Sequence, residues 1–551
     1  MPNLSLLLTD SRKRWLAFAF FIAAVIVHHA FVYLGVYTAD DINYERFAME
    51  ATSGNYSPFD AGHLVQHRWM VIYITSVFYK FFGINEINSS ASGLLCVFSV
   101  GYLIKLILKR ESFHVYVLAL LLYFLNYHTF FSTHKMFADS PVSLFGFLTF
   151  YIYQRASAHA GGKYFLYALC FSVSAFCIML SKETVVLFLP LFLIFLVRDF
   201  RSKRMTRFWI QAIIVSAALL FLYLLAFKIA KGDWFYRYHR LRMENYPCSF
   251  DLFPFIETAK RIGYLLWNAF LLNGDLIVYL FGVCGFIYRN KIKQPPQMKE
   301  FGFAAVILLL TSNFISFSLT SYVPLCQDPR HFIFIVPFAA ISGSYLLKSY
   351  FEQPAKYPLL LLSFGLATLA IFAVGGGEMK YIYLLVLLGL IFIYLNWFFK
   401  KKPLNYWLCF AYFLLCFAIR PFYDLVHNEF AYYTDHKKLV KTVFGNEIRR
   451  GTVYSEDRMT TEINEYFLDF HTGDVRFKDV HQYSAGMTQS PDTYLLINGA
   501  YKPPVEAYID QLVQSRPTSL KLIRRYGRVS LYQVEDKSVL DSLAKYPMFQ
   551  H

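Results

Sequence analysis

Residues 358–402 read PLLLLSFGLATLAIFAVGGGEMKYIYLLVLLGLIFIYLNWFFKKK, two long apolar runs separated by a glycine-rich turn and followed by three lysines. A helix needs about 20 apolar residues to cross a bilayer. The stretch therefore predicts two membrane spans, near 357–374 and 381–399. Because Lys and Arg concentrate in cytoplasmic loops, the lysines at 400–402 mark the cytoplasmic side, and the short loop 375–380 is expected outside.

The same alternation of apolar runs and basic loops covers most of the chain. Of its 551 residues, 56% are hydrophobic and 16% are charged, far more apolar material than one soluble core requires. This composition excludes a disordered or low-complexity chain. The net charge of +16 does not indicate a nucleic-acid partner, because the Lys and Arg residues lie mainly in short clusters between apolar runs, where they set topology.

The sequence predicts an all-α polytopic membrane domain of about 13 transmembrane helices. Besides the two spans already given, apolar runs centre on 16–37, 91–108, 114–131, 141–154, 164–181, 184–197, 208–230, 264–288, 301–320, 332–347 and 404–420.

The segment 65–82 decides the sidedness of every later loop. It is apolar but short, with basic residues near both ends. If it lies flat at the outer interface, every Lys/Arg-rich loop falls on the cytoplasmic side together with the basic cluster 12–14. If it spans, those loops face outward. We therefore interpret 65–82 as an interfacial amphipathic helix, with the N-terminus of the chain cytoplasmic and the C-terminal tail outside.

This topology predicts two domains. Residues 1–420 form the transmembrane domain, with outer loops at 38–90 and 231–263. Residues 421–551 form a small soluble α/β domain on the periplasmic side, and the expected location is a bacterial inner membrane. In this tail, strand patterns at GTVYSE, DTYLLING and the hairpin SLKLIRRYGRVSLYQV alternate with amphipathic helical stretches.

Two cysteines, Cys248 and Cys326, fall in outer loops, where an oxidising compartment permits a disulfide; two unrelated thiols are the alternative. The other six lie in apolar runs, as small buried hydrophobes do. The loop 231–247 mixes Trp, Tyr, Arg and His, which favours an interfacial aromatic anchor over a gating or acceptor-contacting role.

Acidic residues at the outer ends of spans are candidates for chemistry. Asp40 and Asp41 directly follow the first span, and Asp139 opens a later one. Helix capping is one interpretation of each of them. The alternative is a shared acidic site, in which a partly desolvated carboxylate has a raised pKa and acts as a general base. His134 and Lys135 precede Asp139, as interfacial side chains or phosphate contacts.

Basic residues at outer span ends oppose the positive-inside trend, and an anion there would explain them. They are Arg68, Lys182, Arg330 and its neighbour His331. Local ion pairs, such as Lys182 with Glu183 or Arg330 with Asp328, are the alternative for each one separately. As a set they could bind the phosphate of a lipid whose chains lie between the spans.

These motifs, in this order, resemble the GT-C superfamily of membrane glycosyltransferases, especially the branch of lipid A aminoarabinose transferases and protein O-mannosyltransferases. The resemblance rests on an acid pair in the first outer loop, a basic fold-back and four further stretches. They are Asp40-Asp41, His67-Arg68, FGINEINSSASGLL, MFADSPVSLFGFL, IMLSKETVVLFLP and DPRHFIFIVPF. The chain departs from the family at Asp41, often Glu in relatives, at His331, usually Tyr, and in lacking a His-Pro-Pro element around His67.

The resemblance implies inverting transfer of one sugar from a polyprenyl-phosphate carrier to a lipid A, glycan or protein acceptor at the outer face. Asp40 would be the base, and Asp41 and Asp139 would position the acceptor or sugar. Arg68, Lys182 and Arg330, with His331, would bind the donor phosphate. No cofactor is required, although a divalent metal stays open. A lipid-linked glycan polymerase, ligase or flippase is the alternative, and an ion-coupled transporter, which intramembrane acids would indicate, comes third.

Overall fold

The computed structural model describes most of the chain. The described residues are 4–32, 39–60, 64–158, 163–243, 259, 266–317, 323–427, 433–483, 492–499, 503–516 and 518–545. By their internal contacts they form two compact units. The first comprises Met1–Phe31, Ser57–Ile74 and Ser90–Val426, and the second comprises Val32–Tyr56, Thr75–Ser89 and His427–His551. The predicted boundary between residues 420 and 421 stays a prediction, and the second unit includes two N-terminal segments besides the tail.

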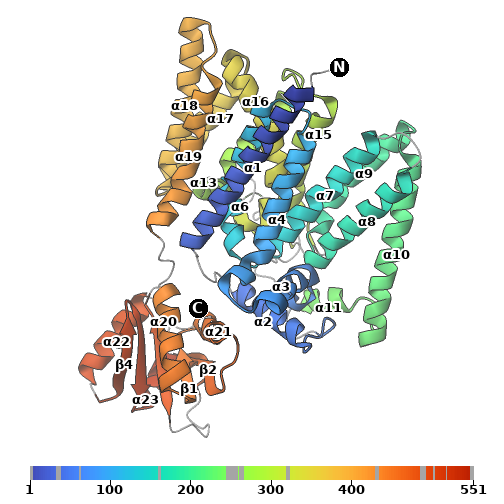
Figure 1. Ribbon diagram of the computed structural model, residues 1–551. Helices are drawn as coiled ribbons and strands as arrows, with labels where there is room; N and C mark the ends of the chain where they lie inside the picture. The colour runs from blue at the N-terminus through green and yellow to red at the C-terminus, as the bar shows by residue number, and fades with distance from the viewer. Residues whose placement is uncertain are drawn as a thin grey trace. The chain divides into compact units, whose positions relative to one another are not determined.

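The first unit is helical (Figure 1). Its elements, two of which continue into the second unit, are α1 (Leu4–Phe31), η1 (Leu64–His67), α3 (Trp69–Phe82), α4 (Glu86–Ile107), α5 (Phe113–Phe124), α6 (Tyr127–Phe131), η2 (Ser132–His134), α7 (Asp139–Ala158), α8 (Tyr164–Ser181), α9 (Val185–Arg201), α10 (Thr206–Lys231), α11 (Tyr236–Met243), α13 (Leu266–Asn273), α14 (Asp275–Ile287), α15 (Pro296–Phe314), η4 (Pro329–Ile335), α16 (Val336–Glu352), η5 (Pro354–Lys356), α17 (Pro358–Val374), α18 (Met379–Lys400) and α19 (Tyr406–Val426).

The chain is an integral membrane protein. Among the described residues, seven helices are long and apolar enough to cross a bilayer, and the bent pair α5–α6 is an eighth candidate. Every predicted span overlaps a helix, but several of these are shorter than 18 residues, so the total of about 13 stays a prediction. Helix α3, at 14 residues, is too short to cross alone, as the interfacial interpretation of 65–82 requires.

Helix α16 is the centre of the first unit, where it packs against α5, α14 and α15. Small residues allow its close approach to α14. A Cβ added at Gly282 would lie 2.7 Å from the Cα of Ala339, and one at Gly285 would lie 2.6 Å from the carbonyl oxygen of Ser342. Such small-residue contacts are typical of helix packing in membranes, because no hydrophobic driving force acts between helices there.

The break between α5 and α6 turns the chain by 65°. Asn126 explains it, since its side chain accepts a hydrogen bond from the backbone N–H of Thr129 and so caps α6. The Asn126 amide also donates to Asp275 at the start of α14, over 2.8 Å. The break thereby holds the start of α6 against α14 and leads into η2, directly before the start of α7.

The second unit is built on a five-stranded sheet of order β2-β1-β3-β5-β4. β1 pairs in parallel with β2 and β3, while β5 pairs antiparallel with β3 and β4. Its elements are α2 (Ala39–Ser53), α20 (Tyr433–Thr442), the π-helical η6 (Val443–Glu447), β1 (Arg450–Ser455), α21 (Arg458–Phe467), β2 (Asp474–Asp479), η7 (Val480–Gln482), β3 (Thr493–Asn498), α22 (Pro503–Ser515), β4 (Leu520–Tyr526), β5 (Val529–Val534) and α23 (Ser538–Lys545).

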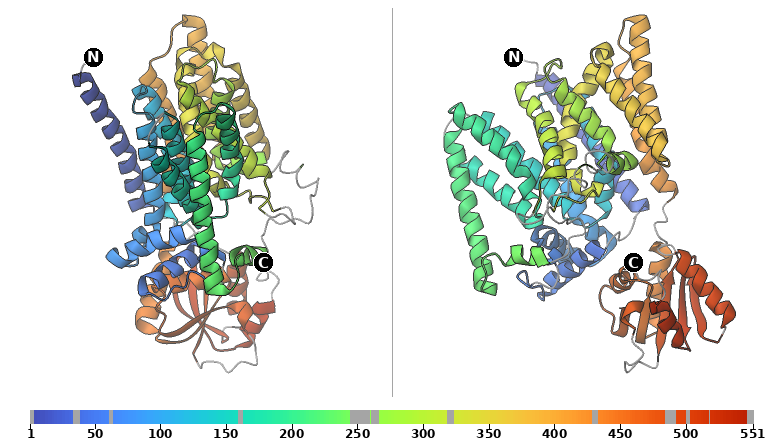
Figure 2. Two further views of the ribbon diagram at one scale, coloured as in Figure 1. Left: turned by 90° about the vertical axis from the view of Figure 1, so that its right-hand side faces the viewer. Right: turned by 180° about the vertical axis from the view of Figure 1, so that it is seen from behind.

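Helices cover both faces of this sheet (Figure 2), so the second unit has two apolar cores. One core joins the strands to α20 and α21, and the other joins them to α22 and α23. Helix α2 belongs to the first of these cores, because Ile42 is buried in it and Arg46 forms a 2.6 Å ion pair with Glu465 of α21. The predicted α-helical membrane domain with a C-terminal α/β domain is confirmed.

Candidate functional site

Three of the predicted site residues meet in the first unit. Asp139 begins α7, Lys182 directly follows α8, and His331 lies in η4. The Lys182 ammonium donates to Asp139 Oδ1 over 2.8 Å, and it lies 2.9 Å from His331 Nδ1. Asp139 and Lys182 are each only 3% exposed. Three segments that are far apart in the chain therefore share one buried ionic contact, which we call the Asp139 cluster.

The imidazole of His331 has two neighbours in this cluster. Its Nδ1 lies 2.9 Å from the Lys182 ammonium and 3.3 Å from Asp139 Oδ2. A charged lysine can only donate, so Nδ1 accepts from Lys182 when it carries no proton and donates to Asp139 when it carries one. Burial lowers the pKa of Lys182, and the Asp139 carboxylate opposes that shift. Asp139 thus serves as the counter-ion of a buried ammonium.

Lys182 and Glu183 are neighbours in sequence but form different ion pairs. The backbone of Lys182 is extended, with φ −163° and ψ 159°, and successive side chains of an extended chain point to opposite sides. Glu183 accepts from Arg237 of α11 over 2.7 Å and lies 3.6 Å from Arg68. The alternative in which Lys182 pairs with Glu183 is therefore wrong.

Two arginines control the ionisation of Glu183. Burial raises its pKa, but the charges of Arg237 and Arg68 outweigh this effect and lower the pKa to about 2. Both guanidiniums are buried themselves, at 8% and 5% exposure. Breaking one half of such a network leaves an uncompensated buried charge, which is strongly destabilising. These pairs hold η1 and α11 against the segment between α8 and α9.

Arg330 is less enclosed than the other cations. Its guanidinium pairs with Asp328 over 2.8 Å and lies above the ring of Phe137, 4.7 Å from the centroid. The local pairing of Arg330 with Asp328 is therefore present. The Arg330 side chain is 13% exposed and that of Asp328 is 36% exposed, which makes them the most exposed cation and the most exposed carboxylate among the ion pairs of this region. Arg330 is thus the cation of this region that can most easily exchange an intramolecular partner for a ligand.

The two sets of charges act on one another, since Arg68 and Arg330 both bear electrostatically on Lys182. Four cations and three carboxylates gather where η1, α7, α8, α11 and η4 meet. The cations are Arg68, Lys182, Arg237 and Arg330, and the carboxylates are Asp139, Glu183 and Asp328. With one positive charge in excess, the arrangement favours an anionic ligand.

Asp40 and Asp41 lie in the first turn of α2, in the second unit. Carboxylates are favoured at a helix N-terminus by the helix dipole. Asp40 is half-buried, while Asp41 is 1% exposed. Their approach to the Asp139 cluster stays a prediction.

The structure corrects one interpretation of the sequence and adds to another. His134 and Lys135 are not interfacial side chains that extend to water, because they are 1% and 2% exposed. Both nitrogens of the His134 ring contact histidines of α1, at 3.2 Å from His28 and 3.0 Å from His29. The loop 231–247 is more than an aromatic anchor, since it supplies the Arg237 that binds Glu183.

Other buried polar residues were missed from the sequence. Asp275 binds His128 over 2.5 Å as well as Asn126. Asp275 lies in the middle of the predicted span 264–288, and nothing local in the sequence connects it to His128. Within the described ranges, no group of three or more His, Cys, Asp or Glu side chains is arranged to hold a metal ion.

Cys326 takes part in a disulfide, while the six cysteines in apolar runs are free thiols. Cys248, its predicted partner, lies outside the described residues.

Two solved structures share this architecture over nearly the whole chain. ArnT from Cupriavidus metallidurans in the apo state superimposes with a TM-score of 0.58 at 11% identity, covering 95% of this chain and 98% of ArnT. ArnT from the same organism bound to undecaprenyl phosphate gives 0.55 at 12% identity, covering 94% and 98%. The chain has the ArnT fold.

The ArnT likeness confirms the predicted GT-C-like fold. No protein-family model and no curated protein sequence matches the chain. Coverage of 94% and 95% of this chain means that the likeness includes both the helical unit and most of the tail.

Proposed function

We propose that this protein is a glycosyltransferase of the bacterial inner membrane. It transfers a single sugar from a polyprenyl-phosphate carrier to a lipid A, glycan or protein acceptor at the outer face. The observation that carries the proposal is the excess of buried cations around Lys182 in a chain whose fold is shared with ArnT bound to undecaprenyl phosphate.

The chemistry of the donor suits such a site. When the sugar passes to the acceptor hydroxyl, its bond to the carrier breaks and the polyprenyl phosphate departs as a phosphate monoester, a leaving group that requires no general acid. Cations that meet the departing oxygen stabilise its charge in the transition state. Arg330 is the best placed to do so, because its partner Asp328 is more exposed than Asp139 or Glu183 and can more easily be replaced by the phosphate. Arg68 and Lys182 complete the positive surroundings, and His331 adds a further hydrogen-bonding group.

The base must be a carboxylate that can accept the proton of the acceptor hydroxyl. Asp139 is unsuited, because two cationic or hydrogen-bonding partners already engage it. It positions Lys182 and His331 and, through them, the donor. Asp40, half-buried at the start of α2, is the proposed base for the acceptor hydroxyl, with inversion at the anomeric carbon, and Asp41 positions the acceptor.

The direct test uses purified full-length protein in nanodiscs and undecaprenyl phosphate as the probe. Wild-type protein should be stabilised by the lipid, and Arg330→Gln should weaken its binding about 10-fold, the loss of one charge-assisted contact. Arg330→Lys should retain most of the affinity. Lys228→Gln, an exposed lysine in the last turn of α10, is the matched control.

Equal binding by wild type and Arg330→Gln would contradict the phosphate site. The activity itself is tested by mass spectrometry of envelope glycolipids from cells with and without the gene. A missing single-sugar modification supports the transferase. A change in the length of a lipid-linked glycan would favour the polymerase or ligase alternative instead.

A further inference from the structure

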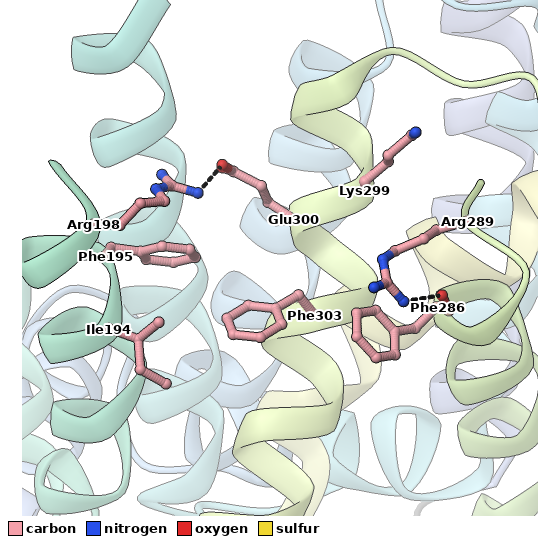
Figure 3. Close-up of a pocket in the computed structure, with 8 residues that line it drawn as sticks. All are labelled: Ile194, Phe195, Arg198, Phe286, Arg289, Lys299, Glu300 and Phe303. Atoms are coloured by element: carbon pink, nitrogen blue, oxygen red, sulfur yellow. Dashed lines mark hydrogen bonds and ion pairs between the residues drawn. The ribbon is translucent and has the colours of Figure 1, made fainter. Parts of the chain in front are cut away.

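A cavity of about 340 Å³ lies between α9, the end of α14 and the start of α15 (Figure 3). Its volume is at the lower end of the range of roughly 300–1,000 Å³ that is typical of ligand pockets. All of its lining residues belong to the first unit. It is separate from the Asp139 cluster, because α9 begins beside that cluster and the cavity lies near the other end of the helix. Arg198 is about 20 Å along α9 from Val185.

Aromatic rings line one part of this cavity. The ring of Phe303 lies 5.9 Å from that of Phe195 and 6.0 Å from that of Phe286, between centroids. Ile194, on the same helix as Phe195, is exposed on the surface of the first unit. The rings and this side chain give the cavity an apolar wall that reaches this surface.

Cations line the other part. Arg198 is already paired, because Glu300 accepts from it over 2.7 Å. Arg289 donates to the carbonyl oxygen of Phe286 and lies 4.1 Å above that ring, and Lys299 donates to the Asn290 amide oxygen over 3.3 Å. Within the described part of the chain, neither Arg289 nor Lys299 forms an ion pair with a carboxylate.

The cavity therefore carries two cations that form no ion pair among the described residues, beside an apolar wall that reaches the surface. It lies at the ends of membrane helices, on the side to which the sequence assigns the Lys/Arg-rich loops. A ligand complementary to it has an anionic head and a hydrocarbon chain. We propose that this cavity is a structural site for an anionic glycerophospholipid, with the phosphate at Arg289 and Lys299 and an acyl chain along Phe303 and Ile194.

A phospholipid suits this place better than the proposed donor. The donor phosphate must reach the cations around Lys182, which lie at the other end of α9. A phospholipid of the near leaflet already has its phosphate at the depth of the helix ends. The bound lipid would join α9 to α14 and α15 at one end of the bundle. This inference does not depend on the proposed transferase activity.

The test measures lipid binding to delipidated full-length protein by native mass spectrometry and thermal shift. The probes are dioleoyl phosphatidylglycerol and dioleoyl phosphatidylcholine, which share chains and differ in head charge. Wild-type protein should prefer the anionic lipid by at least about 10-fold. Arg289→Gln with Lys299→Gln should abolish that preference, while Arg289→Lys alone should keep it.

The matched control is Arg201→Gln with Lys203→Gln, which removes two exposed charges near the end of α9 and leaves the cavity intact. The control should bind like wild type. An equal loss in both double variants would overturn the site and indicate general attraction to the membrane surface. If inorganic phosphate raised the melting temperature as much as the anionic lipid does, the lipid assignment would be wrong. Preferential binding of undecaprenyl phosphate, lost in the cavity variant, would overturn it in favour of the donor.

Discussion

Lys182 and Asp139 form a buried ion pair of 2.8 Å that joins the end of α8 to the start of α7. A buried pair is weak evidence for stability as such, but removing one partner leaves the other charge unpaired. The pair therefore makes Lys182 and Asp139 mutually dependent, which constrains how either residue can be tested.

Asp139→Asn should destabilise the protein by about 3–5 kcal/mol, because Lys182 then loses its counter-ion. Asp139→Asn combined with Lys182→Met should lose much less than the sum of the two single variants. Thermal unfolding of all three variants in detergent measures this coupling. If the stability loss of the double variant equalled the sum of the two single losses, Asp139 and Lys182 would not be energetically coupled.

The ion pairs of Glu183 should make the stability of the helical unit sensitive to acid. The pKa of this carboxyl is about 2 in the folded protein against 4.5 for a free side chain. The stabilisation it provides is therefore complete above about pH 4.5 and is lost as the pH falls toward 2. The size is roughly 3 kcal/mol. Between pH 5 and pH 3 the melting temperature of wild-type protein should fall more steeply than that of Glu183→Gln, and parallel curves would contradict the assignment.

Glu456, directly after β1, should give the opposite dependence of stability on pH. It is fully buried, and its Oε1 accepts hydrogen bonds of 2.9 Å from Thr460 and from the backbone N–H of Asn498. Burial, with a smaller contribution from Asp457, raises its pKa to about 8. Stability should therefore decline as the pH rises from about 4.5 to 8. Glu456→Gln should melt higher than wild type at pH 8 and similarly at pH 5.

Substitutions at Asp40 and at its neighbour Asp41 form a matched pair that tests the proposed base. Asp40→Asn should lower transfer by about 10²- to 10⁴-fold with near-normal thermal stability, because the side chain is half-buried. Asp41→Asn should lower the melting temperature, since Asp41 is 1% exposed. Turnover and melting are measured on the same preparations. Near-normal turnover of Asp40→Asn would remove it as the base.

Sidedness is tested with single cysteines in a Cys170→Ser background, since Cys170 is the exposed thiol among the free cysteines. Cysteines at exposed Asn85 and Lys521 should react with an impermeant thiol reagent in intact cells, and one at Lys203 should not. Labelling of Lys203→Cys, or of only one of the other two, would break the predicted topology.

The long helices and most of the tail were predictable because hydropathy and strand alternation are local properties. Strand β2 was missed, since its sequence DVRFKD carries four charges in six residues. The charged residues of the site were found one by one, from their positions at span ends. Their pairing was not, because Lys182 meets Asp139 across 43 residues and His331 across 149. Arg237 was hidden by the aromatic residues around it.

The membership of α2 in the second unit has a consequence for biosynthesis. Ile42 packs with strands and helices that follow residue 427, so residues 90–426 must be translated before the partner exists. At about 5–20 residues per second, this takes on the order of 20 to 70 s. Throughout that time α2, the helix that carries Asp40 and Asp41, has an apolar face with no partner to pack against. A premature stop codon before the tail would thus disable a segment encoded near the start of the gene.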